Sequence, residues 1–504
     1  MEIVFGVIGI LTICLMMSIW IHKLIEKGIH VWGKEYVKFE ISKRFLRQRP
    51  KPPIHLMVMF TDHYEPQWRT TRIEIERQRV DDWVERYPVL ASRHQDSDGR
   101  YPQHTWFFPI HEYREEHLQK LSGLCYNGFG EIEVHLHHNH DTSEGCEEKL
   151  NKCKELFSQH GGLITCEKDP RITYGFIHGM FALDNSSPKH CGVNDELQIL
   201  KRTGCYADFT FPASRSECQS QKINSIYYAI DDPQKPKSYN NGIDVEKGGK
   251  ATGDLMIIQG LLTINWRIWP KLLYPYLDTG IITHDNLPVK KRVDLWVRDG
   301  VYIKGKAEWK FVKVYSHGTQ EKTRDMLLGE PMDRMHVYLR EKYNDGNKYQ
   351  LHYVTAREAY NIIKASEAGL EGNPNDYRDY LIKPPANTRI LSNVLYQLQS
   401  YTEWSVVMKI LEDKPVNLEF KNHVIEKIEG NIAEIDFKME ILENNLWVKI
   451  NGIGKAKITF NSVKKIKDME NLSFLGNEGN KWRYLIDIDI CKEKPMEMRY
   501  GLRE

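Results

Sequence analysis

Between residues 54 and 369, short apolar segments alternate with longer charged segments, and this alternation constrains the fold more than any other feature of the sequence. The apolar segments include IHLMVMFT (54–61), EIEVHLH (131–137) and WKFVKVY (309–315). The intervening segments, such as 72–86, carry apolar residues at helical spacing. This order predicts an α/β domain with its active site at the carboxyl ends of the strands.

Two signals predict where this domain ends. Thr355-Ala-Arg-Glu358 is a capping box, which predicts a helix from Ala356 to Gly369. Lys383-Pro384-Pro385 then marks a boundary, so we expect a catalytic domain over 54–385. Beyond it the sequence predicts one helical stretch near 395–411, followed by short alternating segments typical of strands. These segments indicate a small β-rich accessory domain over 390–504.

The N-terminus contains an unbroken uncharged run from Val4 to Ile21. Eighteen helical residues span roughly 27 Å, enough to cross the hydrocarbon core of a bilayer. A cleaved signal peptide would need a basic start and a small-residue cleavage site, and neither is present. We therefore expect a single-pass transmembrane anchor at 1–25 and a basic linker at 26–53. The positive charges all follow the run, which predicts a cytoplasmic catalytic domain.

Overall charge and cysteine content exclude several classes of protein. Lysine plus arginine (70) nearly balances aspartate plus glutamate (69), so nothing indicates a nucleic-acid partner. The nine cysteines are irregularly spaced and form no CxxC pair. A zinc ribbon or a disulfide scaffold is therefore not expected, and we interpret the cysteines as buried thiols in a reducing compartment.

The densest chemical signal is the segment EIEVHLHHNHDT at 131–142, which has histidines at 135, 137, 138 and 140. Imidazole is a common metal ligand, and alternate strand positions place His135 and His137 on one face. A solvated histidine-rich loop is the other interpretation. Asp62 ends the first strand and offers a carboxylate. We expect Asp62, His135, His137 and His138 to bind a divalent ion, most simply Zn²⁺, with water and substrate at its open positions.

Four segments in order resemble the motifs of the polysaccharide deacetylases (carbohydrate esterase family 4). They are VMFTDHYEP (58–66), EIEVHLHHNH (131–140), YADFTFPAS (206–214) and FVKVYSHG (311–318). The resemblance implies a distorted (β/α) barrel, a zinc ion, and removal of an acetyl group from an N-acetylated sugar. It also implies that His317 is the general acid.

The resemblance is incomplete at three places. The family's paired aspartates become Thr61-Asp62, so the usual general base is missing, and Asp208, His63 or Glu65 could replace it. The His-x-x-x-His spacing fails because residue 139 is asparagine, and the third motif lacks its arginine. We expect Asp208 and His63 to be catalytic together with His317. Residues expected to line the substrate pocket are Tyr64, His104, His178 and Trp296.

Two other functions stay open at this point. A glycoside hydrolase on a related barrel would need two carboxylates on either side of the scissile bond, for example Asp62 and Asp208. A noncatalytic membrane-associated scaffold in polysaccharide synthesis would bind no metal. The expected partners are accordingly a carbohydrate substrate, a membrane and proteins of polysaccharide synthesis.

Overall fold

The structure is a computed structural model. It describes residues 14–15, 17–19, 21–46, 50–160, 163–166, 169–265 and 276–384, and then 388–391, 394–398, 404–410, 416–419, 425–442, 445–462, 465–466, 472–478, 481–490 and 496–501. The chain divides into two compact units. The first comprises most of the chain up to Ile382, and the second comprises Lys383–Glu504 with the short segments Ser122–Gly128 and Lys154–Glu167.

A largely parallel sheet forms the centre of the first unit, in the order β12-β1-β2-β3-β5-β6-β9-β7-β8, with β13 also paired to β1. Its strands are β1 (Ile54–His63), β2 (His104–Pro109), β3 (Gly130–Leu136), β5 (Asp169–His178), β6 (Cys205–Asp208), β7 (Ile226–Ala229), β8 (Gly242–Asp244), β9 (Leu255–Ile258), β12 (Trp309–Ser316) and β13 (Tyr349–Val354). Every residue of β1 is buried, as expected for a parallel strand covered on both faces.

The sheet curves toward closure. Lys313 lies on β12, at one end of the strand order, and its ammonium donates a hydrogen bond of 2.7 Å to the carbonyl of Phe211, just after β6. Backbone bonds also join Tyr315 of β12 to Gly280 and Ile282. The first unit is therefore a mixed α/β fold with a barrel-like sheet, in agreement with the expected α/β domain.

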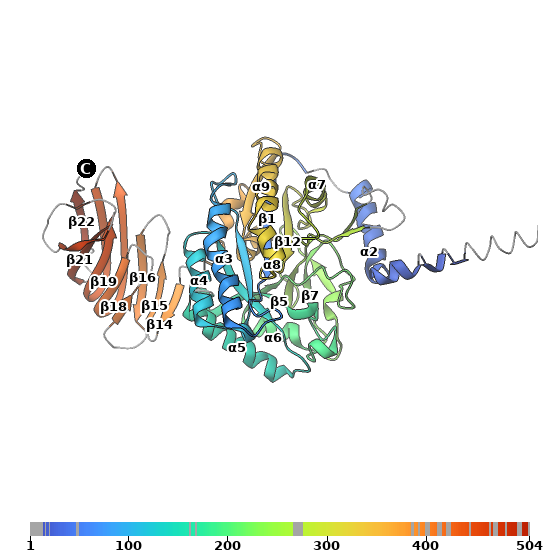
Figure 1. The fold of residues 1–504 in the computed structure, drawn as a ribbon, viewed down its shortest axis with the longest axis horizontal. Helices are drawn as coiled ribbons and strands as arrows, with labels where there is room; N and C mark the ends of the chain where they lie inside the picture. The colour runs from blue at the N-terminus through green and yellow to red at the C-terminus, as the bar shows by residue number, and fades with distance from the viewer. Residues whose placement is uncertain are drawn as a thin grey trace, which may run out of the picture. The chain divides into compact units, whose positions relative to one another are not determined.

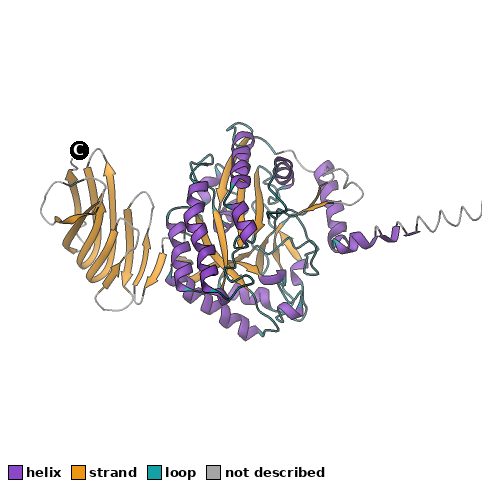
Figure 2. Cartoon of the chain, viewed as in Figure 1, coloured by secondary structure: helices purple, strands orange, loops and turns teal. Residues whose placement is uncertain are grey.

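Helices enclose this sheet (Figure 2). They are α3 (Ile73–Ala91), α4 (Glu115–Tyr126), α5 (Ser143–Gln159), α6 (Glu196–Thr203), α7 (Lys290–Asp299), α8 (Glu321–Leu327), α9 (Glu330–Tyr343) and α10 (Ala356–Glu367). Figure 1 shows α3 and α4 side by side, and Arg77 of α3 pairs with Glu116 of α4 at 3.0 Å. The predicted capping box is confirmed, since Thr355 and Glu358 cap α10 reciprocally.

The segment expected to be a basic linker contains a helix, α2 (Ile29–Ile41). Trp32 and Tyr36 are buried in an apolar cluster with Leu262 and Ile264. The Tyr36 hydroxyl also accepts a hydrogen bond from the backbone N–H of Ile264. A linker was expected because the basic residues dominate the composition, yet apolar side chains at helical spacing pack this segment onto the first unit.

The expected anchor, from Val4 to Ile21, lies largely outside the described residues. Within the part of the chain that the structure describes, we find no helix with the length and apolar character that a membrane span requires.

The second unit is β-rich, as expected, and contains an antiparallel sheet in the order β14-β15-β16-β18-β19-β21-β20, with β17 and β22 paired to β18 and β19 (Figure 2). Its strands are β14 (Thr388–Leu391), β15 (Val394–Leu398), β16 (Trp404–Ile410), β17 (Val416–Glu419), β18 (Ile425–Leu442), β19 (Asn445–Ser462), β20 (Leu472–Glu478), β21 (Lys481–Ile490) and β22 (Met496–Gly501). Alternate residues of β18, such as Ile435, Phe437 and Met439, build its core. The helix expected near 395–411 is wrong, because β15 and β16 occupy that segment.

Candidate metal centre

The carboxyl ends of the parallel strands bring several titratable side chains to one edge of the sheet. The residues at or just beyond these ends are His63 (β1), His135, His137 and His138 (β3), His178 (β5), Asp208 (β6) and His317 (β12). Parallel strands all end at the same edge, so residues far apart in sequence meet there. Four of these histidines, His135, His137, His138 and His178, belong to two groups of side chains that could hold a metal ion, which we describe in turn.

The first group, which we call the open cluster, consists of Glu65, His135 and His137. Nε2 of His137 lies 2.9 Å from Oε1 of Glu65 and 2.9 Å from Nε2 of His135. Nε2 of His135 lies 3.8 Å from the same carboxylate oxygen. The His137 side chain is 28% exposed, so solvent reaches this group. Two imidazoles and one carboxylate leave positions for water and substrate on a bound ion.

The protonation of the open cluster suits a metal ion. Nδ1 of His135 lies 2.8 Å from the carbonyl of Ile177, which only accepts, so Nδ1 carries the proton and Nε2 has a free lone pair. Burial lowers the pKa of His135 and keeps the ring neutral. Burial alone would raise the pKa of Glu65, but the adjacent imidazoles of His135 and His137 lower it well below its ordinary value. The carboxylate is therefore ionised, and the neutral His135 ring offers a lone pair on Nε2.

Two further imidazoles lie beside the open cluster without joining it. The His63 ring lies 5.0 Å from the His135 ring and 4.8 Å from the His317 ring, measured between centroids. Burial, together with His317 and His135, lowers the pKa of His63 well below its ordinary value. These two residues, both expected to be catalytic, are brought together where they can hold or transfer a proton near a bound substrate.

Asp62 is not in the open cluster. Its carboxylate accepts a hydrogen bond of 2.7 Å from the backbone N–H of Gly318 and lies 3.0 Å from Nε2 of His104. The reason is strand parity: Asp62 shares a face of β1 with Phe60, which stacks on His104 on the side covered by Trp83 of α3. His63 points to the opposite face, and the carboxylate beside His135 and His137 is that of Glu65.

Three residues expected in the substrate pocket are buried in structural roles. Tyr64 packs against Trp83 and Phe108. His104 is the partner of Asp62, as described above. Trp296 of α7 donates its indole N–H to Asp278, 2.9 Å away. All three are at most 2% exposed.

Asp208, a candidate for the general base, is also fully buried. Its carboxylate accepts hydrogen bonds from the backbone N–H and the hydroxyl of Thr210, at 3.0 and 2.6 Å. Burial raises the pKa of Asp208 and lowers that of Lys313, to which it is electrostatically coupled. This pair belongs to the interior of the sheet, and neither residue belongs to the open cluster.

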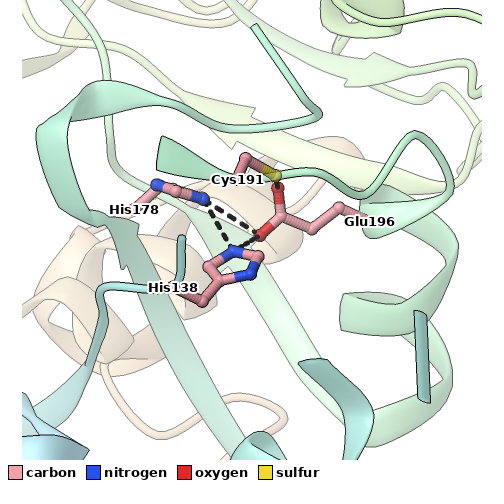
Figure 3. A group of neighbouring side chains, drawn as sticks. All are labelled: His138, His178, Cys191 and Glu196. Atoms are coloured by element: carbon pink, nitrogen blue, oxygen red, sulfur yellow. Dashed lines mark hydrogen bonds and ion pairs between the residues drawn. The ribbon is translucent and has the colours of Figure 1, made fainter. Parts of the chain in front are cut away.

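The second group, which we call the buried quartet, consists of His138, His178, Cys191 and Glu196, and could hold a metal ion. Figure 3 shows the Glu196 carboxylate between the two imidazoles and the thiol. Nε2 of His138 lies 2.8 Å from Nε2 of His178 and 3.1 Å from Oε1 of Glu196. The Cys191 sulfur lies 3.5 Å from the other carboxylate oxygen. His138 therefore belongs to a different group from the adjacent His137. His178, expected to line a substrate pocket, lies in the buried quartet.

Cys191 and Glu196 were not expected to be ligands. They lie five residues apart, on a loop and at the first position of α6, and no short motif joins them to the histidines. The cluster HHNH indicated metal binding, but it did not indicate that two groups share it. Glu65 had been considered only as a replacement base.

No protein-family model matches this chain, and no curated protein matches it. Among solved structures it aligns with the catalytic module of a family 98 glycoside hydrolase from Streptococcus pneumoniae TIGR4, in complex with the H-disaccharide blood group antigen. The identity is 10% and the TM-score 0.15, over 90% of this chain and 86% of that chain. Similarity at this level does not indicate a shared fold or a shared activity.

Proposed function

We propose that the protein is a metal-dependent hydrolase with a divalent ion, most simply zinc, held by Glu65, His135 and His137. One observation carries this proposal: three ligand atoms converge at a solvent-accessible strand edge, next to two imidazoles that are not ligands. An ion bound there would lower the pKa of a water molecule and polarise a carbonyl oxygen. This chemistry suits hydrolysis of an ester or amide.

We assign the other roles in the reaction to residues in and around the open cluster. Glu65 and the two ligand histidines orient the ion, and the Ile177 carbonyl fixes the ring of His135. The family resemblance assigns His317, which is partly exposed just beyond β12, the role of the general acid that protonates the leaving group. His63, neutral and in contact with His317, is positioned to exchange a proton with it.

The substrate class follows from the resemblance to the polysaccharide deacetylases, which covers residues 54–320. We infer that the scissile group is an acetyl or related acyl group on an N-acetylated sugar of a polysaccharide or glycolipid. A glycoside hydrolase is less well supported, because Asp62 and Asp208 are both fully buried and hydrogen-bonded within the protein. Such carboxylates do not lie on either side of a glycosidic bond.

The test is acetate release from N-acetylated oligosaccharides by the full-length protein, measured together with its metal content. The wild type should release acetate, and Glu65→Gln should lose activity and one equivalent of metal. His140→Asn is a matched control, because His140 belongs to the same motif, is exposed and lies outside both groups. A wild type that binds no metal and releases no acetate would support the scaffold instead.

A further inference from the structure

The buried quartet differs from the open cluster because all its ligands are shielded from solvent. We propose that His138, His178, Cys191 and Glu196 form a separate, structural zinc site that fastens the 178–196 loop to the end of β3. All four residues are buried, with no side chain more than 3% exposed. A closed set of four ligands with no position for water is typical of structural zinc, whereas catalytic sites keep one position open.

The two imidazoles present lone pairs to the same point. Nδ1 of His138 lies 3.0 Å from the Asp141 carboxylate, and Nδ1 of His178 lies 2.6 Å from the Gly179 carbonyl. Both oxygens are acceptors, so each Nδ1 carries a proton, and each ring in its neutral form has a lone pair on Nε2. These atoms face one another and the Glu196 carboxylate, which lies 3.1 and 3.4 Å from them. Such an arrangement needs positive charge between them, either a shared proton or a metal ion.

The Cys191 sulfur is the group by which a bound metal ion can be told from a proton shared by the two imidazoles. Sγ of Cys191 accepts hydrogen bonds from the backbone N–H groups of Asn185 and Val193, at 3.3 and 3.5 Å. The same sulfur can donate its thiol proton to the Glu196 carboxylate, at 3.5 Å, and to the Val193 carbonyl, at 3.7 Å. A tetrahedral zinc ion would replace that proton and take all four ligands. Thiolate with imidazole is the combination that zinc prefers.

The loop between His178 and Cys191 has a strained backbone that a bound ion would stabilise. Four residues in it adopt left-handed backbone conformations although none is glycine: Met180 (φ 53°), Phe181 (φ 60°), Asp184 (φ 53°) and Asn185 (φ 50°). Side chains disfavour this region, so surrounding interactions must compensate. An ion bound by residues at both ends of the loop provides that compensation.

Supporting contacts extend beyond the ligands. Asp141, which holds His138, also receives the Lys149 ammonium at 2.7 Å, and its backbone N–H donates to the Cys191 carbonyl at 2.8 Å. The Glu196 carboxylate accepts the backbone N–H of Asp184 at 2.6 Å. Hydrogen-bonded ligands of this kind are characteristic of protein metal sites.

Cobalt substitution tests the site, because only a cysteine ligand gives a thiolate-to-cobalt charge-transfer band. Full-length protein from cells grown with Co²⁺ should show this band. Cys191→Ser should lose the band and one equivalent of metal, whereas the matched variant Cys218→Ser, at a buried cysteine outside both groups, should keep both. Glu65→Gln should keep the band, which separates this proposal from the proposed function.

A second variant covers the case in which Cys191→Ser does not fold. Asp141→Asn keeps all four ligands, and loss of its support should weaken cobalt binding at this site roughly 10–100-fold, read from the band during titration with a chelator. A wild type with bound cobalt but no thiolate band would overturn the proposal. A band that persists in folded Cys191→Ser would also overturn it. So would an Asp141→Asn variant that binds cobalt at this site as tightly as the wild type.

Discussion

Gly179 lies directly against the ring of His137: a β-carbon on this glycine would stand 2.4 Å from Cγ of the histidine. Real β-carbons do not approach other atoms so closely, so the missing side chain makes room for a ligand of the open cluster. Gly179 also accepts a hydrogen bond from Nδ1 of His178 through its carbonyl. One small residue thus contacts a ligand of each group.

The first prediction concerns this contact. Gly179→Ala should displace His137 and lower the affinity of the open cluster for metal, with a corresponding loss of acetate release. Gly123→Ala is the control, because it lies in α4 with no atom within 4 Å of the added carbon. Alanine should be neutral or stabilising there by about 0.5–1 kcal/mol. Equal metal affinity in both variants, measured by chelator competition, would contradict the assignment of His137 as a ligand.

The second prediction separates Asp62 from Glu65. Asp62→Ala leaves the Gly318 N–H and His104 without their acceptor, and should lower the free energy of unfolding by about 1–3 kcal/mol. Its metal content should equal that of the wild type. Glu65→Ala should instead lose metal while the fold persists. Elemental analysis and urea unfolding of the two variants check this. If folded Asp62→Ala loses metal and Glu65→Ala keeps it, Asp62 rather than Glu65 is the ligand.

The third prediction assigns the general acid. His317→Ala should keep the metal of the open cluster and lose roughly two to four orders of magnitude in the rate of acetate release, which is the usual contribution of a general acid. The His317 ring contacts His63, and His317 is not in either metal-binding group. The measurement is kcat with metal content determined on the same sample. A rate within a factor of two of the wild type would exclude this role.

The fourth prediction is a dependence of stability on pH at a histidine remote from both groups. Burial, and then His94, lowers the pKa of His336 to about 3. The unfolded chain takes up this proton near pH 6.5 and the folded protein does not, so stability from this residue falls as pH drops from about 6.5 toward 3. At pH 5 the loss is about 2 kcal/mol.

His336→Asn should remove that part of the pH dependence while keeping a partner for the Tyr353 hydroxyl, which lies 2.9 Å from Nδ1 of His336. Chemical unfolding at pH 7 and pH 5 compares the two proteins. If the difference between them is the same at both pH values, His336 does not titrate as described.

The fifth prediction concerns α2. A chain shortened to begin at Pro52 loses Trp32 and Tyr36 from the apolar cluster and uncovers Leu262 and Ile264. It should unfold at lower temperature than a chain shortened to begin at Lys23, which keeps the helix. Trp32→Ala in the full chain should cost about 3–5 kcal/mol, because the side chain is fully buried. Equal melting temperatures of the two shortened chains would show that α2 does not stabilise the α/β unit.

Sequence patterns were sufficient for the architecture of the first unit and for the edge of the sheet where the groups meet. They were not sufficient to predict which side chains of β1 lie on which face of the sheet. A strand buried on both sides has no alternation of polar and apolar residues, so the sequence gives no sign that His63 rather than Asp62 faces His135. A shift of one residue reverses the face of every side chain in a strand, so the sequence could not show that Asp62 faces away from His135.

The buried quartet lay beyond sequence reasoning for a different reason. Its ligands come from the end of β3, the end of β5, a loop and the start of α6, and only the tertiary fold brings them together. The β-rich unit could be predicted from its alternation, as β18 illustrates. The segment containing β15 and β16 could not, because short apolar runs such as these fit a helix or a strand and periodicity alone does not distinguish the two.

His137 and His138 are consecutive, yet each belongs to a different group of ligands. An insertion or deletion of one residue within 135–138 would therefore turn these two side chains away from their groups. Both groups would lose a ligand through one change in the sequence. Among descendants of this sequence, these four residues should be inherited as a block of fixed length, with Gly179 and Cys191 retained alongside it. The exposed turn at Pro188–His190, which lies between ligands but contributes none, is free to change in length and composition.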